Sequence, residues 1–124
     1  MKSSEQINEL AAALSIAQGM MKPAVKNKTN PHFKSKYADL DSCWEACKEP
    51  MSANGLAVIQ APSYEDGRIV ITTRICHKSG QWIEESLHLK PMKDDAQAAG
   101  SCISYGRRYM LGMLGVTSDE DDDG

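Results

Sequence analysis

Residues 56–89, LAVIQAPSYEDGRIVITTRICHKSGQWIEESLHL, decide the fold because they contain three strand-like runs separated by two turn signals. The runs are LAVIQA from Leu56, RIVITTRIC from Arg68 and QWIEESLHL from Gln81, and β-branched or aromatic residues recur in each. An Asp-Gly pair at 66–67 and a Ser-Gly pair at 79–80 separate the runs, and both suit tight hairpin turns that need positive backbone angles. The sequence therefore predicts a three-stranded antiparallel β-meander.

Alternation of side chains gives this predicted sheet one apolar face and one partly polar face. In the second run, Ile69, Ile71 and Ile75 fall on one side, whereas Thr72 and Arg74 fall on the other. The third run separates in the same way into Ile83, Leu87 and Leu89 against Trp82, Glu84, Ser86 and His88. We therefore expect one face of the sheet to be buried and the other to be partly solvated.

A helix is predicted before the sheet, near the N-terminus. Ser3 or Ser4 can cap it, Gln6 stands where a capping box requires it, and Pro23 limits it. Its apolar stripe comprises Ile7, Leu10, Leu14, Ala17 and Met21. The polar, turn-rich stretch KPAVKNKTNP that follows predicts a loop.

Two more helices are predicted, one on each side of the strands. The first begins near residue 38 or 39 and stops at Asn54-Gly55, and the second runs from about residue 94 or 95 to Leu114. The buried stripe expected for the last helix is Ala99, Cys102, Ile103, Gly106, Met110 and Met113. The order α-loop-α-β-β-β-α predicts one α+β domain over residues 1–118, its meander covered by helices, followed by an acidic tail at 119–124.

The distribution of charge is more informative than the net charge of -3. Five of the 17 acidic residues lie in the terminal stretch DEDDDG, so the rest of the chain is mildly basic. Between Lys22 and Ala38 there is no acidic residue and there are five lysines, Lys22, Lys26, Lys28, Lys34 and Lys36. Such a concentrated positive segment is typical of nucleic-acid binding.

The basic segment also contains aromatic residues. Lys26, Lys28, Lys34 and Lys36 can follow a nucleic-acid backbone, while Phe33 and Tyr37 offer faces on which bases can stack. The alternative is a surface loop whose lysines serve solubility. Both interpretations stay open at the level of the sequence.

The last predicted helix carries small residues and cations away from its buried stripe. Gly100, Ser101, Ser104, Arg107 and Arg108 fall roughly along one sector, where small side chains let a phosphate strand approach and the arginines can make forked bonds to it. The alternative is a tightly packed helix with a solvated charged face. Tyr105 and Tyr109 stand one turn apart; we expect packing for Tyr109 and leave Tyr105 open.

Signatures of enzymes and of cofactor sites are weak. The chain has no Cys-x-x-Cys pair, no recognisable zinc set and no Gly-rich loop ending in Gly-Lys-Ser/Thr, so neither a metal cofactor nor ATP use is expected. We expect four reduced thiols, Cys43, Cys47, Cys76 and Cys102, because no export signal precedes the domain. With no long apolar run either, a soluble cytoplasmic protein is expected.

Five stretches occur in an order found in one known family: LAAALSIAQ, NPHFKSKYADLDSCW, HKSGQWI, DDAQAAGSCISYGRRYMLGMLGV and the terminal DEDDDG. Together, over nearly the whole chain, they resemble the essential recombination function (ERF) family of phage single-strand annealing proteins. The segments NP-x-F-K-S-KYADL and SYGRRY-x-L are the specific ones. A His-Lys-Ser-Gly turn alone would mean little.

The resemblance implies a protein without catalytic activity that binds single-stranded DNA, forms rings or helical filaments and pairs complementary strands without ATP. It also implies action in the bacterial host cytoplasm beside a phage exonuclease or a host single-strand binding protein. By position, the matching segments give as candidate DNA or subunit contacts Lys34, Lys36 and Tyr37 in the first, and Gln97, Ser101, Tyr105, Arg107 and Arg108 in the second.

Three questions stay open on sequence alone. Members of the family commonly continue beyond the position of DDDG, so we expect either a trimmed or a short form of the protein. A passive single-strand binder without annealing activity is one rival function, and a metal-dependent nuclease that uses the tail carboxylates is another. The tail itself is either a solvated acidic run or an internal competitor for the cationic DNA-binding residues.

Overall fold

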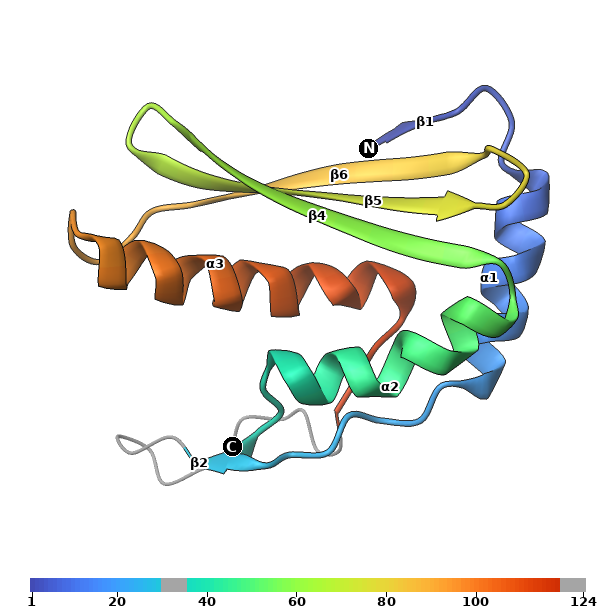
Figure 1. Cartoon of the computed structure of the whole chain (residues 1–124), viewed down its shortest axis with the longest axis horizontal. Coiled ribbons are helices and arrows are strands. Elements are labelled where there is room, and N and C mark those ends of the chain that lie inside the picture. The colour runs from blue at the N-terminus through green and yellow to red at the C-terminus, as the bar shows by residue number, and fades with distance from the viewer. Residues whose placement is uncertain (30–35, 119–124) are drawn as a thin grey trace.

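A computed structural model describes residues 1–29 and 36–118 of the chain and has the predicted α+β fold (Figure 1). Its elements are β1 (Lys2–Ser3), α1 (Asn8–Met20), β2 (Lys28–Thr29), β3 (Lys36–Tyr37), α2 (Leu40–Ala53), β4 (Leu56–Glu65), β5 (Arg68–His77), β6 (Trp82–Leu89), α3 (Ala96–Met110) and the 3₁₀ helix η1 (Leu111–Leu114). Phe33, Lys34 and the acidic residues of the tail lie outside the described residues.

The main sheet has four strands in the order β1-β6-β5-β4, so the prediction of a three-stranded sheet is wrong in its strand number. The predicted strands β4, β5 and β6 are antiparallel neighbours, and the turn between β4 and β5 uses positive φ at Asp66 (49°) and Gly67 (78°) as expected. The additional strand β1 pairs Lys2 with Glu84 and Ser3 with Ile83. A two-residue strand shows no period in a sequence, which is why the pattern did not predict it.

Formation of β1 also overturns the predicted N-terminal cap. The side chain of Ser4 accepts a hydrogen bond from the backbone nitrogen of Trp82 at 3.0 Å, and no side chain of the capping residue Ile7 caps α1. Instead the Oε1 atom of Gln81 accepts from the backbone nitrogens of Glu9 and Leu10, at 2.8 and 2.9 Å. The β5–β6 turn therefore provides the oxygen that an N-cap normally supplies.

The helices lie on one side of the sheet, with α3 along it and α1 across its end (Figure 1). The core between the layers is apolar and includes the fully buried Leu10, Ala17, Cys47, Ile71, Ile75, Leu111 and Leu114. Burial raises the pKa of the Cys47 thiol to about 11, with the neighbouring Cys43 adding to the shift, and all four cysteines are free. The expectation of unpaired thiols agrees with this arrangement.

Helix α3 packs tightly against the sheet at Gly106. A Cβ atom added there would lie 2.7 Å from Cγ1 of Ile71 and 2.8 Å from Cδ1 of Leu89. The predicted inner stripe of α3 is confirmed, because Gly106 and Met110 are buried and the rest of the stripe packs beside them. With this side fixed against the sheet, the opposite side of α3 faces outward.

Capping aspartates set the starts of α2 and α3 near the positions predicted. The Oδ1 atom of Asp39 accepts from the backbone nitrogen of Ser42 at 2.9 Å, and that of Asp95 accepts from Ala98 at 2.8 Å. The helix α2 ends at the expected Asn54-Gly55 pair, with Gly55 at a φ of 69°. No helix in the described ranges is both long and apolar enough to cross a membrane.

Candidate nucleic-acid interface

Part of the predicted basic loop forms a short ribbon. Strand β2 pairs with β3 so that Lys28 lies opposite Tyr37 and Thr29 lies opposite Lys36. Residues directly opposite each other in an antiparallel pair share a face, so Lys28 and Tyr37 project to one side of the ribbon. All four of these residues are exposed. The ribbon thereby places a cation and an aromatic ring together.

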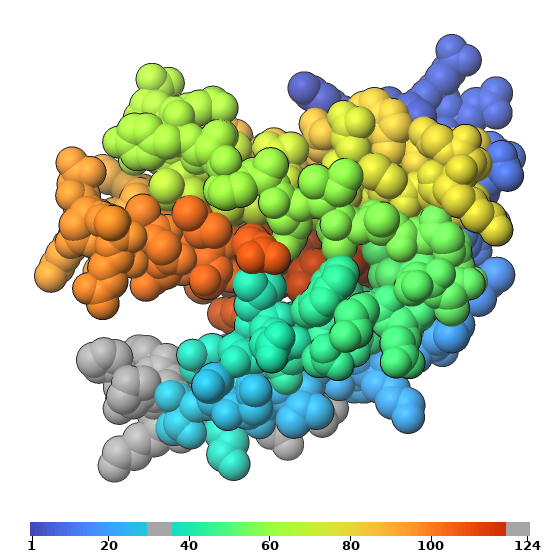
Figure 2. Space-filling view, in the orientation of Figure 1, coloured from blue at the N-terminus to red at the C-terminus, as the bar shows by residue number. Residues whose placement is uncertain are grey.

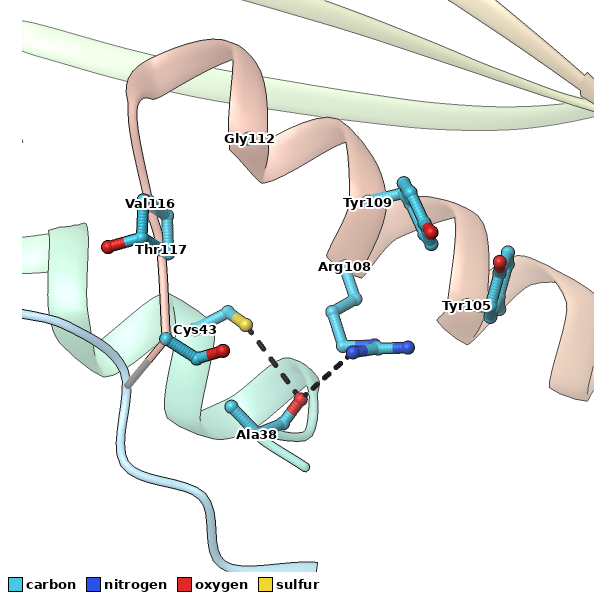
Figure 3. Close-up of a pocket in the computed structure, with 9 residues that line it drawn as sticks. Ala38, Cys43, Tyr105, Arg108, Tyr109, Gly112, Val116 and Thr117 are labelled. Carbon is cyan, nitrogen blue, oxygen red and sulfur yellow. Dashed lines mark hydrogen bonds between the residues drawn. The ribbon is translucent and has the colours of Figure 1, made fainter. Parts of the chain in front are cut away.

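Arg108 of α3 lies among three tyrosine rings. Its guanidinium carbon is 5.4 Å from the ring centroid of Tyr37, 5.6 Å from that of Tyr105 and 5.9 Å from that of Tyr109. These distances fall within the range of cation–π attraction. One guanidinium nitrogen also donates to the carbonyl oxygen of Ala38 at 3.3 Å (Figure 3). We call Arg108, Tyr37, Tyr105 and Tyr109 the arginine–tyrosine cluster.

The tyrosine rings of this cluster remain open to solvent, although two of them contact each other. The rings of Tyr105 and Tyr109 are 4.8 Å apart and inclined by 41°, so the expected packing of Tyr109 is with Tyr105. The exposed fractions of Tyr37, Tyr105 and Tyr109 are nevertheless 39%, 45% and 60%. A hydrogen bond with Tyr109 and partial desolvation raise the pKa of Tyr105.

Four of the α3 residues predicted to contact DNA or a neighbouring subunit fall on one outward side of the helix. Gln97, Ser101, Tyr105 and Arg108 span an arc of about 80° at 3.6 residues per turn. The first three are exposed, and Gly100 beside them has open space where a side chain would project. An extended strand can therefore run along this side of α3 toward the arginine–tyrosine cluster.

Arg107 lies apart from this side, which corrects the expectation that the two arginines share one sector. Its Nε atom donates to Oε1 of Gln60 at 3.2 Å, and the amide nitrogen of Gln60 donates back to the carbonyl oxygen of Arg107 at 3.0 Å. Arg107 lines a separate groove with Trp44 and Val58, visible between β4, α2 and α3 (Figure 2). Consecutive helix residues diverge by about 100°, so one arginine faces β4 and the other faces Ala38.

The arginine–tyrosine cluster differs from another arginine–aromatic contact in whether a carboxylate pairs with the arginine. On the outer face of the sheet, Arg74 lies 3.7 Å from the ring centroid of Trp82, and its Nε atom is 2.8 Å from a carboxylate oxygen of Glu84. By contrast, no carboxylate in residues 1–29 or 36–118 forms an ion pair with Arg108. Arg108 can therefore offer its charge to an anionic ligand, whereas Glu84 neutralises Arg74.

A cleft of about 310 Å³ adjoins the cluster, at the lower end of the range for ligand pockets. It is lined by Ala38, Cys43, Tyr105, Arg108, Tyr109, Gly112, Val116, Thr117 and Ser118. This lining supplies a cation, aromatic rings and hydroxyl groups. In the part of the chain that the structure describes, no group of three or more His, Cys, Asp or Glu side chains is placed to hold a metal ion.

The remaining predicted contacts are distributed around the cluster. Lys36 is exposed and projects from the other face of the ribbon than Lys28 does. Lys26 lies just before the ribbon, is half-buried and has an interaction of its own. Lys34 falls outside the described residues. The structure thus brings together Lys28, Tyr37, Tyr105 and Arg108, continues them along α3 with Ser101 and Gln97, and leaves Arg107 apart.

Comparison with protein families matches residues 10–124 to the model of the ERF superfamily. This chain belongs to the ERF superfamily. The ERF family is one of phage recombination and single-strand annealing proteins. Neither the curated proteins nor the solved structures contain a match to the chain.

The two sequence segments that most specifically resemble the ERF family meet in space. Tyr37 and Ala38 come from the first segment and Arg108 from the second, 70 positions further along the chain. Sequence reasoning proposed Tyr37, Tyr105 and Arg108 separately but missed the Ala38 carbonyl group and the role of Gln60 as a partner of Arg107. The spacing of Tyr105, Arg108 and Tyr109 on one helix was the available signal for the cluster.

Proposed function

We propose that this ERF protein binds single-stranded DNA and anneals complementary strands without ATP and without catalysing a covalent step. The observation that carries the proposal is the arginine–tyrosine cluster, in which the two ERF-like segments supply three exposed aromatic rings and one cation that forms no ion pair within residues 1–29 and 36–118. Proteins that hold single strands regardless of sequence combine these two kinds of group.

In this proposal the cations hold the phosphate backbone. Arg108 can form forked bonds to phosphate oxygens, and Lys28 and Lys36 add charge on the adjoining ribbon. Contacts of this kind carry no sequence information, which suits a protein that must anneal any pair of complementary strands. They also release counterions, so the affinity falls as salt rises.

The tyrosines hold the bases. Each base presents a π-face, and stacking on Tyr37, Tyr105 or Tyr109 leaves the pairing edge of that base open to a complementary strand. In a duplex the faces are already stacked on neighbouring bases and are not accessible to the rings. The cluster therefore favours single strands over duplex DNA.

Pairing of complementary oligonucleotides by the purified protein tests the proposal. We expect the annealing rate to rise above the spontaneous rate equally with and without ATP. Changing Tyr105 and Tyr109 together to alanine should weaken single-strand binding by at least about tenfold, because stacking contributes roughly 1–3 kcal/mol per base. Tyr64→Ala is the matched control, since Tyr64 is exposed on the β4–β5 hairpin.

The same assay separates the rival functions. Binding with no acceleration of pairing would contradict annealing and identify a passive single-strand binder. Mg²⁺-dependent cleavage that disappears on removal of residues 119–124 would instead identify a nuclease. A nuclease needs carboxylates fixed by rigid elements around metal ions, and the described lining of the cleft includes no carboxylate.

Action as an oligomer is part of the proposal because one small domain contacts only a few nucleotides. Helix α1 supports it: no charged residue follows Glu9 in the helix, and Ile16 and Met20 are 59% and 49% exposed. A helix that is uncharged on its outward side is typical of a packed surface. The exposed apolar residues of α1 are therefore a candidate surface for contacts between subunits, in addition to the residues that the sequence suggested.

Mass measurement by light scattering tests the assembly. We expect more than four subunits per particle at micromolar protein with saturating single-stranded DNA. A mass equal to that of one chain under these conditions would contradict oligomeric action. The measurement with and without DNA shows in addition whether the strand drives assembly.

A further inference from the structure

A groove separate from the cleft of the arginine–tyrosine cluster lies between α2, α3 and the outermost strand β4 (Figure 2). Its volume is about 590 Å³, against about 310 Å³ for that cleft, and lies within the usual range of ligand sites. Three aliphatic side chains line it together with four that can stack or form hydrogen bonds, namely Asp41, Trp44, Gln60 and Arg107. We call it the Trp44 groove.

The two charged groups of the Trp44 groove do not neutralise each other. Asp41 and Arg107 are both exposed, and within residues 1–29 and 36–118 neither forms an ion pair. Gln60 accepts the Nε–H of Arg107 at 3.2 Å, and no further hydrogen bond to a described residue occupies the two terminal nitrogens of the guanidinium group. The groove therefore offers an acceptor and several donors to the same ligand.

The aromatic wall of the groove is held in place by the core. Trp44 is half-buried, because it packs against the core as well as lining the groove. A ring held in this way loses little side-chain entropy when a flat ligand stacks on it. Stacking on aromatic side chains is also how proteins hold single-stranded bases regardless of sequence.

A nucleobase matches this combination of groups. Every base has a π-face for Trp44 and a pairing edge on which donors and acceptors lie side by side. Such an edge can donate to Asp41 and accept from Arg107. A phosphate offers acceptors only, and Asp41 would repel it. The Trp44 groove therefore suits a base, whereas the cleft beside Arg108, whose described lining has no carboxylate, suits a phosphate.

The start of α2 places the Trp44 groove next to the arginine–tyrosine cluster. Ala38 lines the cleft with Arg108. Leu40 and Asp41, which follow closely in the chain, line the groove with Arg107. The two arginines differ in height along α3 by about 1.5 Å, the rise of one helical residue. A strand whose phosphate is bound by Arg108 is therefore close enough to direct a neighbouring base into the groove.

We propose that the Trp44 groove holds one unpaired base of the strand bound at the arginine–tyrosine cluster, stacked on Trp44 with its pairing edge between Asp41 and Arg107. The inference rests on the proposed function, because the cluster must first bind the strand. A base in this position cannot pair within its own strand. A complementary strand offers it pairing partners and stacked neighbours, so pairing releases it from the groove. Because only one base is held, the groove contributes less affinity than the cluster.

Tryptophan emission tests the inference directly. The chain has two tryptophans, so Trp82→Phe leaves Trp44 as the only one. When a labelled oligothymidylate is added to this variant, we expect the Trp44 emission to fall by about one third or more, in parallel with the rise in anisotropy of the label. Trp44→Phe is the matched control. Its remaining Trp82 lies on the outer face of the sheet beside Arg74, and its emission should stay unchanged.

The outcomes distinguish failure of the inference from failure of the proposed function. Binding by anisotropy without a change of Trp44 emission would overturn the inference and leave the proposed function intact. A Trp44 signal that begins only after the anisotropy has saturated would place a second strand in the groove and overturn it too. Emission that depends on protein concentration but not on DNA would identify a second copy of the chain as the occupant, with the same consequence. If the oligothymidylate does not bind at all, the proposed function fails and the inference with it.

Two further ligands test whether the occupant is an unpaired base. An abasic oligodeoxynucleotide carries phosphates without bases, so it should leave the Trp44 emission unchanged even when it is bound. Adding a complementary oligodeoxyadenylate to the oligothymidylate complex should restore the emission, because pairing removes the base from the groove. Quenching by the abasic strand, or quenching that persists in the paired product, would contradict the binding of an unpaired base.

Asp41→Ala tests the polar end of the groove. Loss of a carboxylate by itself favours DNA binding, so the control is Glu49→Ala, which removes an exposed carboxylate from the same helix outside the groove. Asp41→Ala should bind the oligothymidylate roughly three- to fivefold more weakly than Glu49→Ala, because the base loses a hydrogen bond. Equal affinity of the two variants, or tighter binding by Asp41→Ala, would show that Asp41 does not contact the base and would overturn the inference.

Discussion

Arg108→Ala should weaken binding of single-stranded DNA roughly tenfold or more at about 0.1 M salt, because the proposed site would lose the cation of the arginine–tyrosine cluster. The plot of the logarithm of the affinity against the logarithm of the salt concentration should also become less steep, by the amount that corresponds to about one phosphate contact. Fluorescence anisotropy with a labelled oligothymidylate across a salt series measures both effects. Thermal unfolding checks that the variant remains folded after loss of the bond to Ala38.

Arg107→Ala is the matched control, since it removes the same charge from the next position of the same helix. Arg107 forms its hydrogen bond with Gln60 in a separate groove, so its loss should cost clearly less affinity than the loss of Arg108. Arg108→Lys should retain part of the binding because the charge survives but the planar fork does not. A larger loss of affinity in Arg107→Ala than in Arg108→Ala would contradict the assignment of the site.

Gly106→Val should lower the free energy of unfolding by about 1–3 kcal/mol or more, the usual cost of overpacking a core. The Cβ atom alone would lie 2.7 Å from Ile71 and 2.8 Å from Leu89, and Ile71 is fully buried and cannot move aside. Relief of this clash requires α3 to shift away from the sheet. Since α3 carries Tyr105, Arg108 and Tyr109, we also expect weaker DNA binding in the fraction that stays folded.

Gly100→Val controls for the change of residue type. Gly100 lies in the same helix, is exposed, and has nothing within 4 Å of an added Cβ atom. The small gain in helix propensity of valine over glycine should leave its stability within a few tenths of a kcal/mol of the parent. Urea unfolding of both variants makes the comparison, and equal midpoints would show that α3 does not pack on the sheet at Gly106.

The main sheet could be predicted from the sequence to the extent that its signals are local. Alternation in residues 68–76 and the Asp-Gly pair at 66–67 act within a few residues, and both features appear in the structure as expected. Strand β1 has only two residues and depends on pairing with β6, more than 75 positions away. The cap of α1 by Gln81 is likewise a tertiary contact, so Ser3 and Ser4 were the wrong local choice.

In the candidate site, too, the sequence indicated features that act locally but not the tertiary contacts between them. The sequence indicated separately that Tyr37, Lys28 and the outward side of the last helix could contact DNA. It did not indicate that Tyr37 lies 5.4 Å from the Arg108 guanidinium group, because that contact depends on how α2 and α3 pack. It grouped Arg107 with Arg108 because they are neighbours in sequence, whereas β4 and the chain before α2 approach α3 from different sides.

Photo-cross-linking tests most directly the claim that the two ERF-like segments form one DNA-binding surface. A single strand containing photoreactive thymidine analogues would be bound to the full chain, irradiated, and the linked peptides identified by mass spectrometry. We expect cross-links to the peptides that contain Tyr37 and Tyr105–Tyr109, in the same complexes and reduced at high salt. Cross-links confined to Tyr64 on the β4–β5 hairpin and to Trp82 on the outer face of the sheet, with none at those peptides, would contradict it.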